Sequence, residues 1–328
     1  MALNGCSVEI VKAASRMNPR VSLALPVYNG ENFLAQAIEA VLAQTYRDFE
    51  LIITDNCSSD STPQICDSYQ RLDSRVRYHR NPVNLGAAKN YNRGFELARG
   101  EYLKWCAHDD LLSPGFLERC VEVLDTRPDV ALVFARTECI DGAGAPVDWA
   151  AANSMPPIES DSAAARFGDA IMFCGTCFPI FGLFRMDVLR RSTLHRGYYG
   201  SDRALLAEVA LLGKLVEAPP DAVFYNREHV QRSINIDSQA ERSRWQNANA
   251  RPSASMEHIN LLLHLLAIAG RHPQAASRVA AFGKVLRFAL QRRQLGRYVL
   301  DLIRYFFPRT AQNLKQRLLG TARTPSHT

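Results

Sequence analysis

The sequence lacks the features that define several common classes of protein. No stretch approaches the roughly 18 apolar residues of a membrane-spanning helix, because the longest apolar run, residues 261–270, is short and contains a histidine. The N-terminus has no basic segment followed by an apolar one, so we expect no export signal. The eight cysteines follow no framework spacing, and Cys174 and Cys177 have no second pair. We therefore expect a cytoplasmic protein with reduced, buried thiols rather than disulfides or a zinc site.

Glycine-rich phosphate loops are also missing. A GxGxxG loop after the first strand would indicate dinucleotide binding, and GxxxxGK[ST] would indicate a P-loop NTPase. Residues 26–31 read Pro-Val-Tyr-Asn-Gly-Glu and match neither pattern. Without a glycine cradle we expect a metal ion to hold any bound phosphate, which points to a sugar nucleotide.

Charge is distributed unevenly along the 328 residues. Residues 241–328 contain 15 Lys and Arg against 3 Asp and Glu, whereas the other 240 residues contain 24 against 30. The basic C-terminal region is therefore expected to meet an anionic partner. It contains no recognised nucleic-acid-binding module, so nucleic acid is the weaker candidate.

Short apolar segments alternate with segments of helical periodicity between residues 21 and 134. We expect helices beginning near residues 33, 62, 87 and 113, and strands over residues 21–25 (ended by Pro26), 49–54, 76–79, 102–107 and 130–134. Such alternation is typical of βαβ units. The expected fold is α/β, with a mainly parallel sheet flanked by helices.

Polar residues follow the first, second and fourth of these strands, where ligands of parallel sheets gather. The most informative are Asp109 and Asp110, which come directly after the fourth strand. Two adjacent carboxylates repel each other and raise each other's pKa unless a cation or hydrogen-bond donors compensate. A hard divalent ion would compensate and could bridge to a pyrophosphate. The alternative is that the pair caps the following helix.

Four motifs in order resemble the family 2 glycosyltransferases, which have the GT-A fold. They are Val-Ser-Leu-Ala-Leu-Pro-Val-Tyr-Asn at 21–29, Phe-Glu-Leu-Ile-Ile-Thr-Asp-Asn-Cys-Ser-Ser-Asp-Ser-Thr at 49–62, Asn-Leu-Gly at 84–86 and His-Asp-Asp at 108–110. The similarity runs over roughly residues 20 to 235. It implies a nucleoside-diphosphate-sugar donor, a divalent metal (Mn²⁺ or Mg²⁺) and inverting transfer to a hydroxyl of a saccharide or lipid-linked acceptor. Synthesis of a cell-surface polysaccharide or glycolipid is the expected setting.

The resemblance divides the chain into three regions. Residues 1–19 would be an N-terminal extension, residues 20–240 the GT-A domain, and residues 241–328 a basic helical C-terminal region. The segment 141–180, rich in Ala, Pro and Gly, offers no readable pattern for the sugar.

The resemblance also implies roles for residues at the nucleotide end. Pro26 and Tyr28 would flank the base, with Tyr28 stacking on it; otherwise Tyr28 is a half-buried aromatic at a strand end. Asp55 would accept a hydrogen bond from the base ring, which is compatible with an Asx turn. Asn29 and Glu31 would bind the nucleotide or cap the next helix. Lys89 would face the nucleotide or be a solvated helix residue.

The acidic pair and a late histidine match the family's diphosphate and metal site. Asp109 matches the residue that contacts the ribose, and Asp110 matches the metal ligand. Many relatives have an acidic residue where this chain has His108, so only the pair itself is carried over. His229, in the segment Tyr-Asn-Arg-Glu-His, matches a histidine that reaches the metal or pyrophosphate; otherwise it is structural.

Asp202 falls where the family places its catalytic base, at the start of an apolar helix. The base usually follows a glutamate, and here Ser201 precedes it, so the motif is degenerate. The alternative is that Ser201 or Asp202 simply caps the helix. Two other functions remain open: a nucleotide-sugar-binding protein with weak or no turnover, and a sugar nucleotidyltransferase. The second usually has Arg or Lys in the loop after the first strand, and residues 26–31 have neither.

An amphipathic helix is expected in the basic region. At 100° per residue, Arg293, Arg297 and Arg304 share one side, and Pro308 ends the run. Apolar residues cluster on the opposite side, namely Phe288, Leu295, Val299, Leu302 and Phe306. We expect residues 281–320 to hold the protein peripherally on the inner face of an anionic membrane. The alternative is an ordinary helix whose apolar stripe packs on the body.

Overall fold

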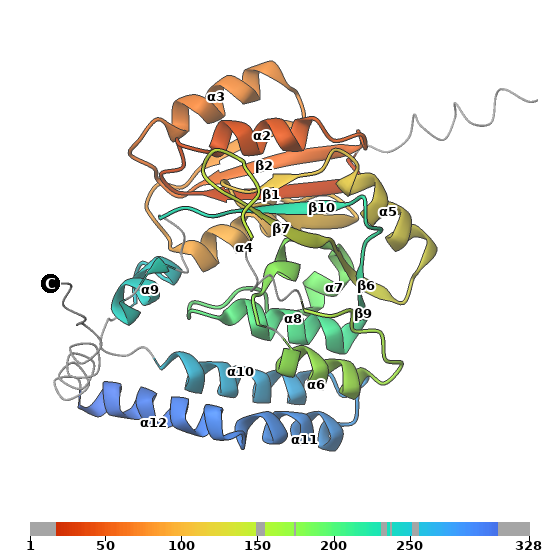
Figure 1. The fold of residues 1–328 in the computed structure, drawn as a ribbon, viewed down its shortest axis with the longest axis vertical. Coiled ribbons are helices and arrows are strands. Elements are labelled where there is room, and N and C mark those ends of the chain that lie inside the picture. Colours follow the sequence, from red (N-terminus) through yellow and green to blue (C-terminus); the bar gives the residue numbers. More distant parts are fainter. Residues whose placement is uncertain are drawn as a thin grey trace, which may run out of the picture.

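The structure is a computed structural model that describes residues 18–148, 155–173, 175–230, 235–236, 238–250 and 256–307. Within these residues a seven-stranded sheet has the order β3-β2-β1-β4-β8-β6-β9 (Figure 1). In that order the strands are Val76–Arg80, Phe49–Asp55, Val21–Val27, Tyr102–Trp105, Leu183–Arg185, Val130–Phe134 and Lys214–Glu217. Neighbouring strands are parallel except for β8, which is antiparallel to β4 and β6. A mainly parallel α/β sheet, as the sequence predicted, is confirmed.

Alternate residues of β1 face opposite layers of helices, which is the two-residue period of a strand. Leu23 and Leu25 pack in one core with α2 (Leu34–Leu42), α3 (Thr62–Leu72) and α5 (Phe116–Thr126). Ala24 faces the other core, beneath α4 (Ala87–Leu97). A Cβ at Gly94 of α4 would lie 2.6 Å from the Cβ of Ala24, so two small residues let this helix approach the sheet.

A second, three-stranded sheet lies next to the ends of the central strands. Its strand β10 (Val223–Arg227) pairs antiparallel with β5 (Leu111–Leu112) and parallel with β7 (Arg136–Ile140). β5 follows β4 after only five residues. The small sheet therefore brings the end of β10 to the carboxyl end of β4.

The C-terminal helices share one apolar core with two earlier helices of the chain. α8 (Ser201–Leu212) packs on α6 (Ala163–Phe173), α11 (Arg278–Ala289) packs on α6, and α10 (Glu257–Arg271) packs on α8 and α11. Buried residues of α10 and α11 join one apolar cluster with those of α6 and α8. Figure 1 shows these helices stacked below the sheet. The elements α7 (Met186–Arg191), α9 (Gln239–Gln246) and a short 3₁₀ turn, η1 (Phe178–Phe181), complete the connections.

The last helix, α12 (Arg292–Phe306), packs on α10 with its polar side inward. Asp301 is fully buried and accepts hydrogen bonds from the backbone N–H groups of His258 at 2.8 Å and Ile259 at 3.2 Å. It thereby satisfies the start of α10, whose own N-cap has no side-chain hydrogen bond. The apolar stripe instead faces solvent, with exposed fractions of 46%, 54%, 42% and 64% for Leu295, Val299, Leu302 and Phe306. The alternative in which the stripe packs on the body is therefore wrong for these four residues.

Several expected boundaries differ from the structure. Pro26 does not end β1, which continues to Val27; β4 pairs no further than Ala24, so no β4 residue needs an N–H from position 26. The amphipathic helix expected in the basic region is divided into α11 and α12 at residues 290–291, so Phe288 lies in α11, where it is buried, and is not part of the α12 stripe. The predicted segment 308–320 lies outside the described residues. No helix in the described ranges is long and apolar enough to cross a bilayer.

Candidate functional site

A cleft of about 940 Å³ opens at the carboxyl ends of β1, β2 and β4, and helices α4, α8, α9, α10 and α12 add to its walls. Most of the residues that the sequence analysis singled out line it: Pro26, Tyr28, Asn29, Asp109, Asp110, Asp202 and His229. Glu31, Asp55 and Lys89 are not among the lining residues. The cleft therefore brings the nucleotide-end residues and Asp202 into one cavity.

The loops after β1 and β2 are tied together by Asn29. Its backbone has a φ of 51°, a left-handed conformation that Asn tolerates better than most residues. Its Oδ1 accepts from the N–H of Ser59 at 2.9 Å, and its own N–H donates to the Oγ of Ser58 at 2.9 Å. Asn29 therefore shapes the floor of the cleft at the nucleotide end.

Glu31 and Lys89 both lie at the margin of this region. Glu31 is exposed and accepts from the backbone N–H of Ser61 at 2.9 Å, which adds a second link between the two loops. α2 begins without a side-chain cap, so the alternative in which Asn29 or Glu31 caps it is wrong. Lys89 is exposed on α4 and points away from the lining, as a solvated helix residue would.

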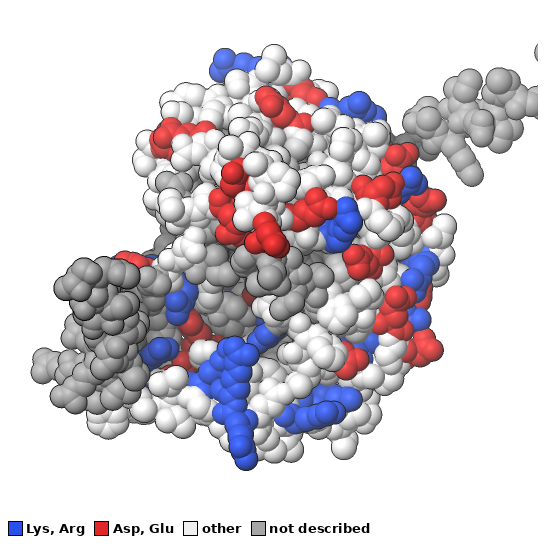
Figure 2. Space-filling view, in the orientation of Figure 1, with Lys and Arg blue, Asp and Glu red and all other residues white. Residues whose placement is uncertain are grey.

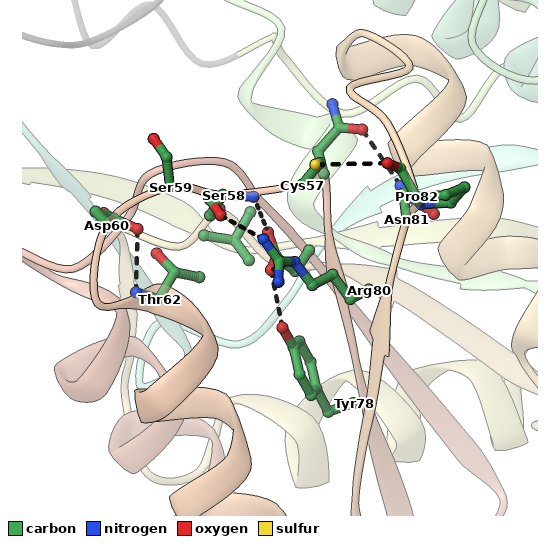
Figure 3. Close-up of polar contacts among 12 residues, drawn as sticks. Cys57, Ser58, Ser59, Asp60, Thr62, Tyr78, Arg80, Asn81 and Pro82 are labelled. Carbon is green, nitrogen blue, oxygen red and sulfur yellow. Dashed lines mark hydrogen bonds and ion pairs between the residues drawn. The ribbon is translucent and has the colours of Figure 1, made fainter.

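Asp55 is fully buried at the end of β2. Its Oδ1 accepts from the N–H of Ser58 at 2.8 Å, the turn that the sequence allowed. Its Oδ2 accepts from the hydroxyl of Tyr78 at 2.8 Å and lies 3.5 Å from Nε of Arg80. Burial, followed by the hydrogen bond to Asp55, raises the pKa of Tyr78, so the phenol remains a donor. Figure 3 shows Tyr78 and Arg80 reaching from β3 toward the loop of Ser58.

A chain of asparagine amides supports the cleft wall between β2 and α4. The Nδ2 of Asn56 donates to the Oδ1 of Asn84 at 2.9 Å, and the Nδ2 of Asn81 donates to the Oδ1 of Asn90 at 2.9 Å. Asn81 also donates to Asn56 at 3.2 Å, and Asn90 donates to the carbonyl of Thr54 at 2.7 Å. The sequence analysis used Asn84 only as part of a motif and missed the other amides.

The acidic pair takes its partners from β10 and the segment after it. The Oδ2 of Asp109 lies 2.7 Å from the Nε2 of His229. The Oδ1 of Asp110 accepts from the Nδ2 of Asn226 at 3.1 Å and from the N–H of Arg227 at 2.9 Å. The following helix, α5, begins without a side-chain cap, so the capping alternative for the pair is wrong. His229 thus meets Asp109 rather than Asp110.

Two opposing effects set the pKa of Asp109. Burial acts to raise it, whereas the charges of His108 and His229 and the hydrogen bond from His229 lower it, and the net pKa lies below the usual value. The carboxylate therefore stays ionised. Its negative charge faces the cleft, where a cation would be attracted.

Arg227 fixes the backbone beneath the acidic pair. It is almost fully buried, and its guanidinium donates to the carbonyls of Asp109 at 2.9 Å and Gly142 at 2.9 Å. It also donates to the Oε1 of Gln36 at 2.8 Å and lies 4.7 Å from the centre of the Phe33 ring. This single side chain joins β10, the β4 end, α2 and the loop after β7.

The polar side chains around the acidic pair fit a divalent cation that takes some of its ligands from the protein and the others from a bound diphosphate. Within the described residues no group of three or more His, Cys, Asp or Glu side chains is arranged to hold a metal alone. Two buried atoms beside the pair, Oδ1 of Asn226 and Nδ1 of His229, have no hydrogen-bond partner in the described part of the chain. Mg²⁺ and similar ions commonly take one or two protein carboxylates and complete their shell with phosphate and water.

Asp202 lies in the first turn of α8. The residue before the helix is Gly200, in a left-handed conformation with φ of 86°, and the helix has no side-chain cap. The alternative in which Ser201 or Asp202 caps α8 is therefore wrong. Asp202 accepts from the N–H of Arg203 at 2.9 Å. Burial raises the pKa of Asp202, and hydrogen bonds from Arg203 and Cys177 only partly offset this.

His195 is a further lining residue that sequence reasoning missed. It is 8% exposed, and its ring meets those of Trp105 and Tyr91 with centres 4.8 and 5.1 Å apart. Its Nε2 has no hydrogen-bond partner among the described residues. Burial lowers its pKa to about 4, so the ring is neutral near pH 7. No local sequence pattern marks it, because its position depends on the packing of three distant segments.

Comparison with known proteins identifies the family to which this fold and cleft belong. The family model for glycosyl transferase family 2 matches residues 22–186, half of the chain. The chain therefore belongs to glycosyl transferase family 2.

Curated relatives carry glycosyltransferase names. The uncharacterized glycosyltransferase RT0329 of Rickettsia typhi is 37% identical over 126 residues, which cover 38% of each chain. Glycosyltransferase GlyG of Streptococcus pneumoniae serotype 4 is 34% identical over 102 residues, which cover 31% of this chain and 34% of that protein. The chain thus aligns with less than two fifths of the length of these relatives.

Solved structures share the fold at low sequence identity. TarS 1–349 of S. aureus in complex with UDP-GlcNAc has a TM-score of 0.59 at 16% identity and covers 87% of this chain and 80% of that one. The mannosyltransferase PcManGT of Pyrobaculum calidifontis, in complex with GDP-Man and Mn²⁺, has a TM-score of 0.50 at 17% identity, covering 89% and 88%. Both extend over the C-terminal helices as well as the sheet.

Proposed function

We propose that the chain is an inverting glycosyltransferase that moves a sugar from a nucleoside-diphosphate sugar to a hydroxyl of a saccharide or lipid-linked acceptor. Synthesis of a cell-surface polysaccharide or glycolipid is the setting. One observation carries the proposal: Asp202 lines the same cleft as the acidic pair Asp109 and Asp110. A carboxylate base and a diphosphate site in one cavity are what a direct displacement at an anomeric carbon needs.

The nucleotide lies at the β1–β2 end of the cleft. Tyr28, which is half exposed, stacks on the base, and Pro26 lies on its other side. The Oδ2 of Asp55 accepts a hydrogen bond from the base ring. The same oxygen accepts from the hydroxyl of Tyr78 and pairs with Arg80. Because Asp55 is fully buried, the base must pass beyond the residues that line the cleft to make this contact. Asn29 and Glu31 act by holding the two loops together.

The diphosphate lies over the acidic pair, with Asp109 beside the ribose. A divalent cation, Mn²⁺ or Mg²⁺, held by Asp110 and His229 would neutralise the charge of the departing diphosphate. The 2.7 Å contact between His229 and Asp109 brings Asp109 within reach of the same ion. PcManGT and GalNAc-T7 were both solved with Mn²⁺, which supports this choice of cofactor.

Asp202 acts as the general base. It takes the proton of the attacking hydroxyl while that oxygen bonds to the anomeric carbon and the bond to the diphosphate breaks. A raised pKa suits this role, because proton transfer is most efficient when the pKa of the base approaches the working pH. One displacement inverts the configuration, so no second carboxylate has to act as a covalent nucleophile.

We also propose that α11 and α12 hold the enzyme peripherally on an anionic membrane surface. Both helices carry exposed apolar residues at helical spacing: Val279, Phe282, Leu286 and Leu290 on α11, and Leu295, Val299, Leu302 and Phe306 on α12. In each helix the exposed apolar residues follow the residues of the packed side by one position in sequence. One position turns the helix by about 100°, so each set lies beside the packed side of its helix. Figure 1 shows α11 and α12 following one another along one edge of the molecule. The cationic excess of residues 241–328 suits anionic lipid.

The Asp202→Asn variant separates chemistry from donor binding. It keeps the side-chain volume and removes the base, so we expect nucleoside diphosphate release to fall about 10²–10⁴-fold while donor affinity changes little. The assay uses UDP-, GDP- and dTDP-sugars with Mn²⁺ or Mg²⁺. Asp187→Asn is the matched control, because Asp187 is an exposed aspartate in the first turn of α7.

Other outcomes of this assay would overturn the assignment. Loss of donor affinity in Asp202→Asn would place Asp202 in the donor site. Tight donor binding by the wild type without any turnover would favour a nucleotide-sugar-binding protein. Pyrophosphate release from a nucleoside triphosphate and a sugar phosphate would favour a nucleotidyltransferase.

The pH profile of kcat/KM tests the environment of Asp202. Burial raises its pKa above 3.8, so activity should be lost as pH falls through a value above the ordinary aspartate range and be retained at higher pH. The residual activity of Asp202→Asn should lack this acid limb. An acid limb that is unchanged in the variant would show that another group controls it.

Flotation with lipid vesicles tests the membrane surface. Vesicles containing phosphatidylglycerol should bind the protein, salt should weaken the binding, and Val299→Glu with Phe306→Glu should abolish it because both side chains are exposed apolar groups. Leu72→Glu is the control, since Leu72 is equally apolar and 79% exposed on α3. Failure to bind these vesicles at low salt, or a stable dimer through the same residues, would contradict membrane attachment.

A further inference from the structure

Three arginines on helices of the cleft wall line the cavity. Arg203 comes from α8, Arg244 from α9 and Arg297 from α12, and all three line the cavity. We call them the arginine cluster. Figure 2 shows Lys and Arg side chains gathered on the part of the surface that α11 and α12 form. The cluster is assembled from helices nearly 100 residues apart in sequence, so it is a product of the fold.

Within the described residues no carboxylate forms an ion pair with the arginine cluster, although the charge of Arg203 acts on the neighbouring Asp202. The acidic side chains of the neighbouring helices are occupied elsewhere. Glu257, which also lines the cleft, pairs with Arg242 at 3.3 Å, and Asp301 binds the start of α10. In the described part of the chain, the guanidinium of Arg297 donates a weak hydrogen bond of 3.5 Å to the Oε1 of Gln294.

Other enclosed arginines of this protein are well satisfied, which sets the cluster apart. Arg166 donates to the carbonyls of Ala210 at 2.8 Å and Ser160 at 2.7 Å, and Arg227 has several partners of the same kind. Burial, the charge of Arg293 and the charge of Arg203 instead all lower the pKa of Arg297. Like charges held together in a partly enclosed place are unfavourable until an anion joins them.

The cluster lies beside the group that we assign as the base. Arg203 is the neighbour of Asp202 in α8, and its N–H donates to the Asp202 carboxylate. Trp245, next to Arg244, is partly exposed and meets the ring of Tyr199 with centres 6.4 Å apart. An aromatic face of this kind packs well against a sugar ring. The surroundings of Asp202 thus combine apolar stacking with positive charge.

We propose that the arginine cluster binds a phosphate ester of the acceptor, close to the hydroxyl that Asp202 deprotonates. The inference rests on the proposed function and specifies its acceptor class: a saccharide or polyol that carries phosphate. Guanidinium groups suit this ligand because their planar N–H pairs match two phosphate oxygens. Three such groups on three elements, none of them in an ion pair within the described residues, provide the charge that the ester needs.

Calorimetry on the full chain tests the cluster once the donor end is filled with UDP or GDP and Mn²⁺. Glycerol phosphate should then bind at one site per chain, and uncharged glycerol should not. Arg203→Gln with Arg297→Gln should weaken glycerol phosphate by about tenfold or more and leave nucleotide affinity unchanged. Arg293→Gln is the matched control, because Arg293 is exposed on the same helix and is not a lining residue.

The outcomes separate the inference from the function on which it rests. If nucleoside diphosphate does not bind, the proposed function fails. If it binds but glycerol phosphate does not, only the acceptor class is wrong. Weaker nucleotide binding in the double variant would assign the arginines to the donor diphosphate and would also overturn the inference. Short-chain phosphatidylglycerol provides a second arm: tighter binding than glycerol phosphate supports a lipid-linked ester, and equal binding supports a soluble one.

Discussion

The cleft depends on how two adjacent carboxylates at the end of β4 are held together. Asp109 and Asp110 would repel each other if both stood alone in a partly buried site. β10 and the segment after it supply the donors that prevent this: the N–H of Arg227 donates to Asp110, and His229, which follows β10, bonds to Asp109. The side chain of Arg227 then fixes the carbonyl of Asp109 and the loop after β7. The small three-stranded sheet is therefore the support that presents the acidic pair to the cleft.

The C-terminal helices serve the same cleft from the other side. α10 and α11 share their core with α6 and α8, so they position α8, which carries Asp202. α12 is anchored by a buried polar residue, Asp301, which satisfies the start of α10. Because the packed side of α12 is polar, its apolar side is left exposed and its arginine Arg297 reaches the cleft. One helix thus takes part in two proposed surfaces, one for membrane and one for acceptor.

The sequence predicted the parallel sheet and a set of site residues most of which line the cleft, because strands, loops and acidic motifs are local patterns. It could not predict contacts that depend on packing between distant segments. His229 was matched to the metal site, but its partner proved to be Asp109 rather than Asp110 because β10 enters beside β5. His195 carries no local signal at all, since its surroundings come from α4 and β4. Periodicity located the apolar stripe of α12 but wrongly included Phe288, because it shows neither where a helix is broken nor what covers a stripe.

Calorimetric titration of UDP and GDP, with and without Mn²⁺, tests the central claim most directly: the acidic pair and a divalent cation together bind the diphosphate of a sugar donor. The wild-type chain should bind one nucleoside diphosphate, and removal of the metal by chelation should abolish binding. Asp110→Asn should lose the metal-dependent binding while circular dichroism shows an unchanged fold. Equal affinity without metal, or undiminished metal-dependent binding by Asp110→Asn, would contradict the assignment of this site.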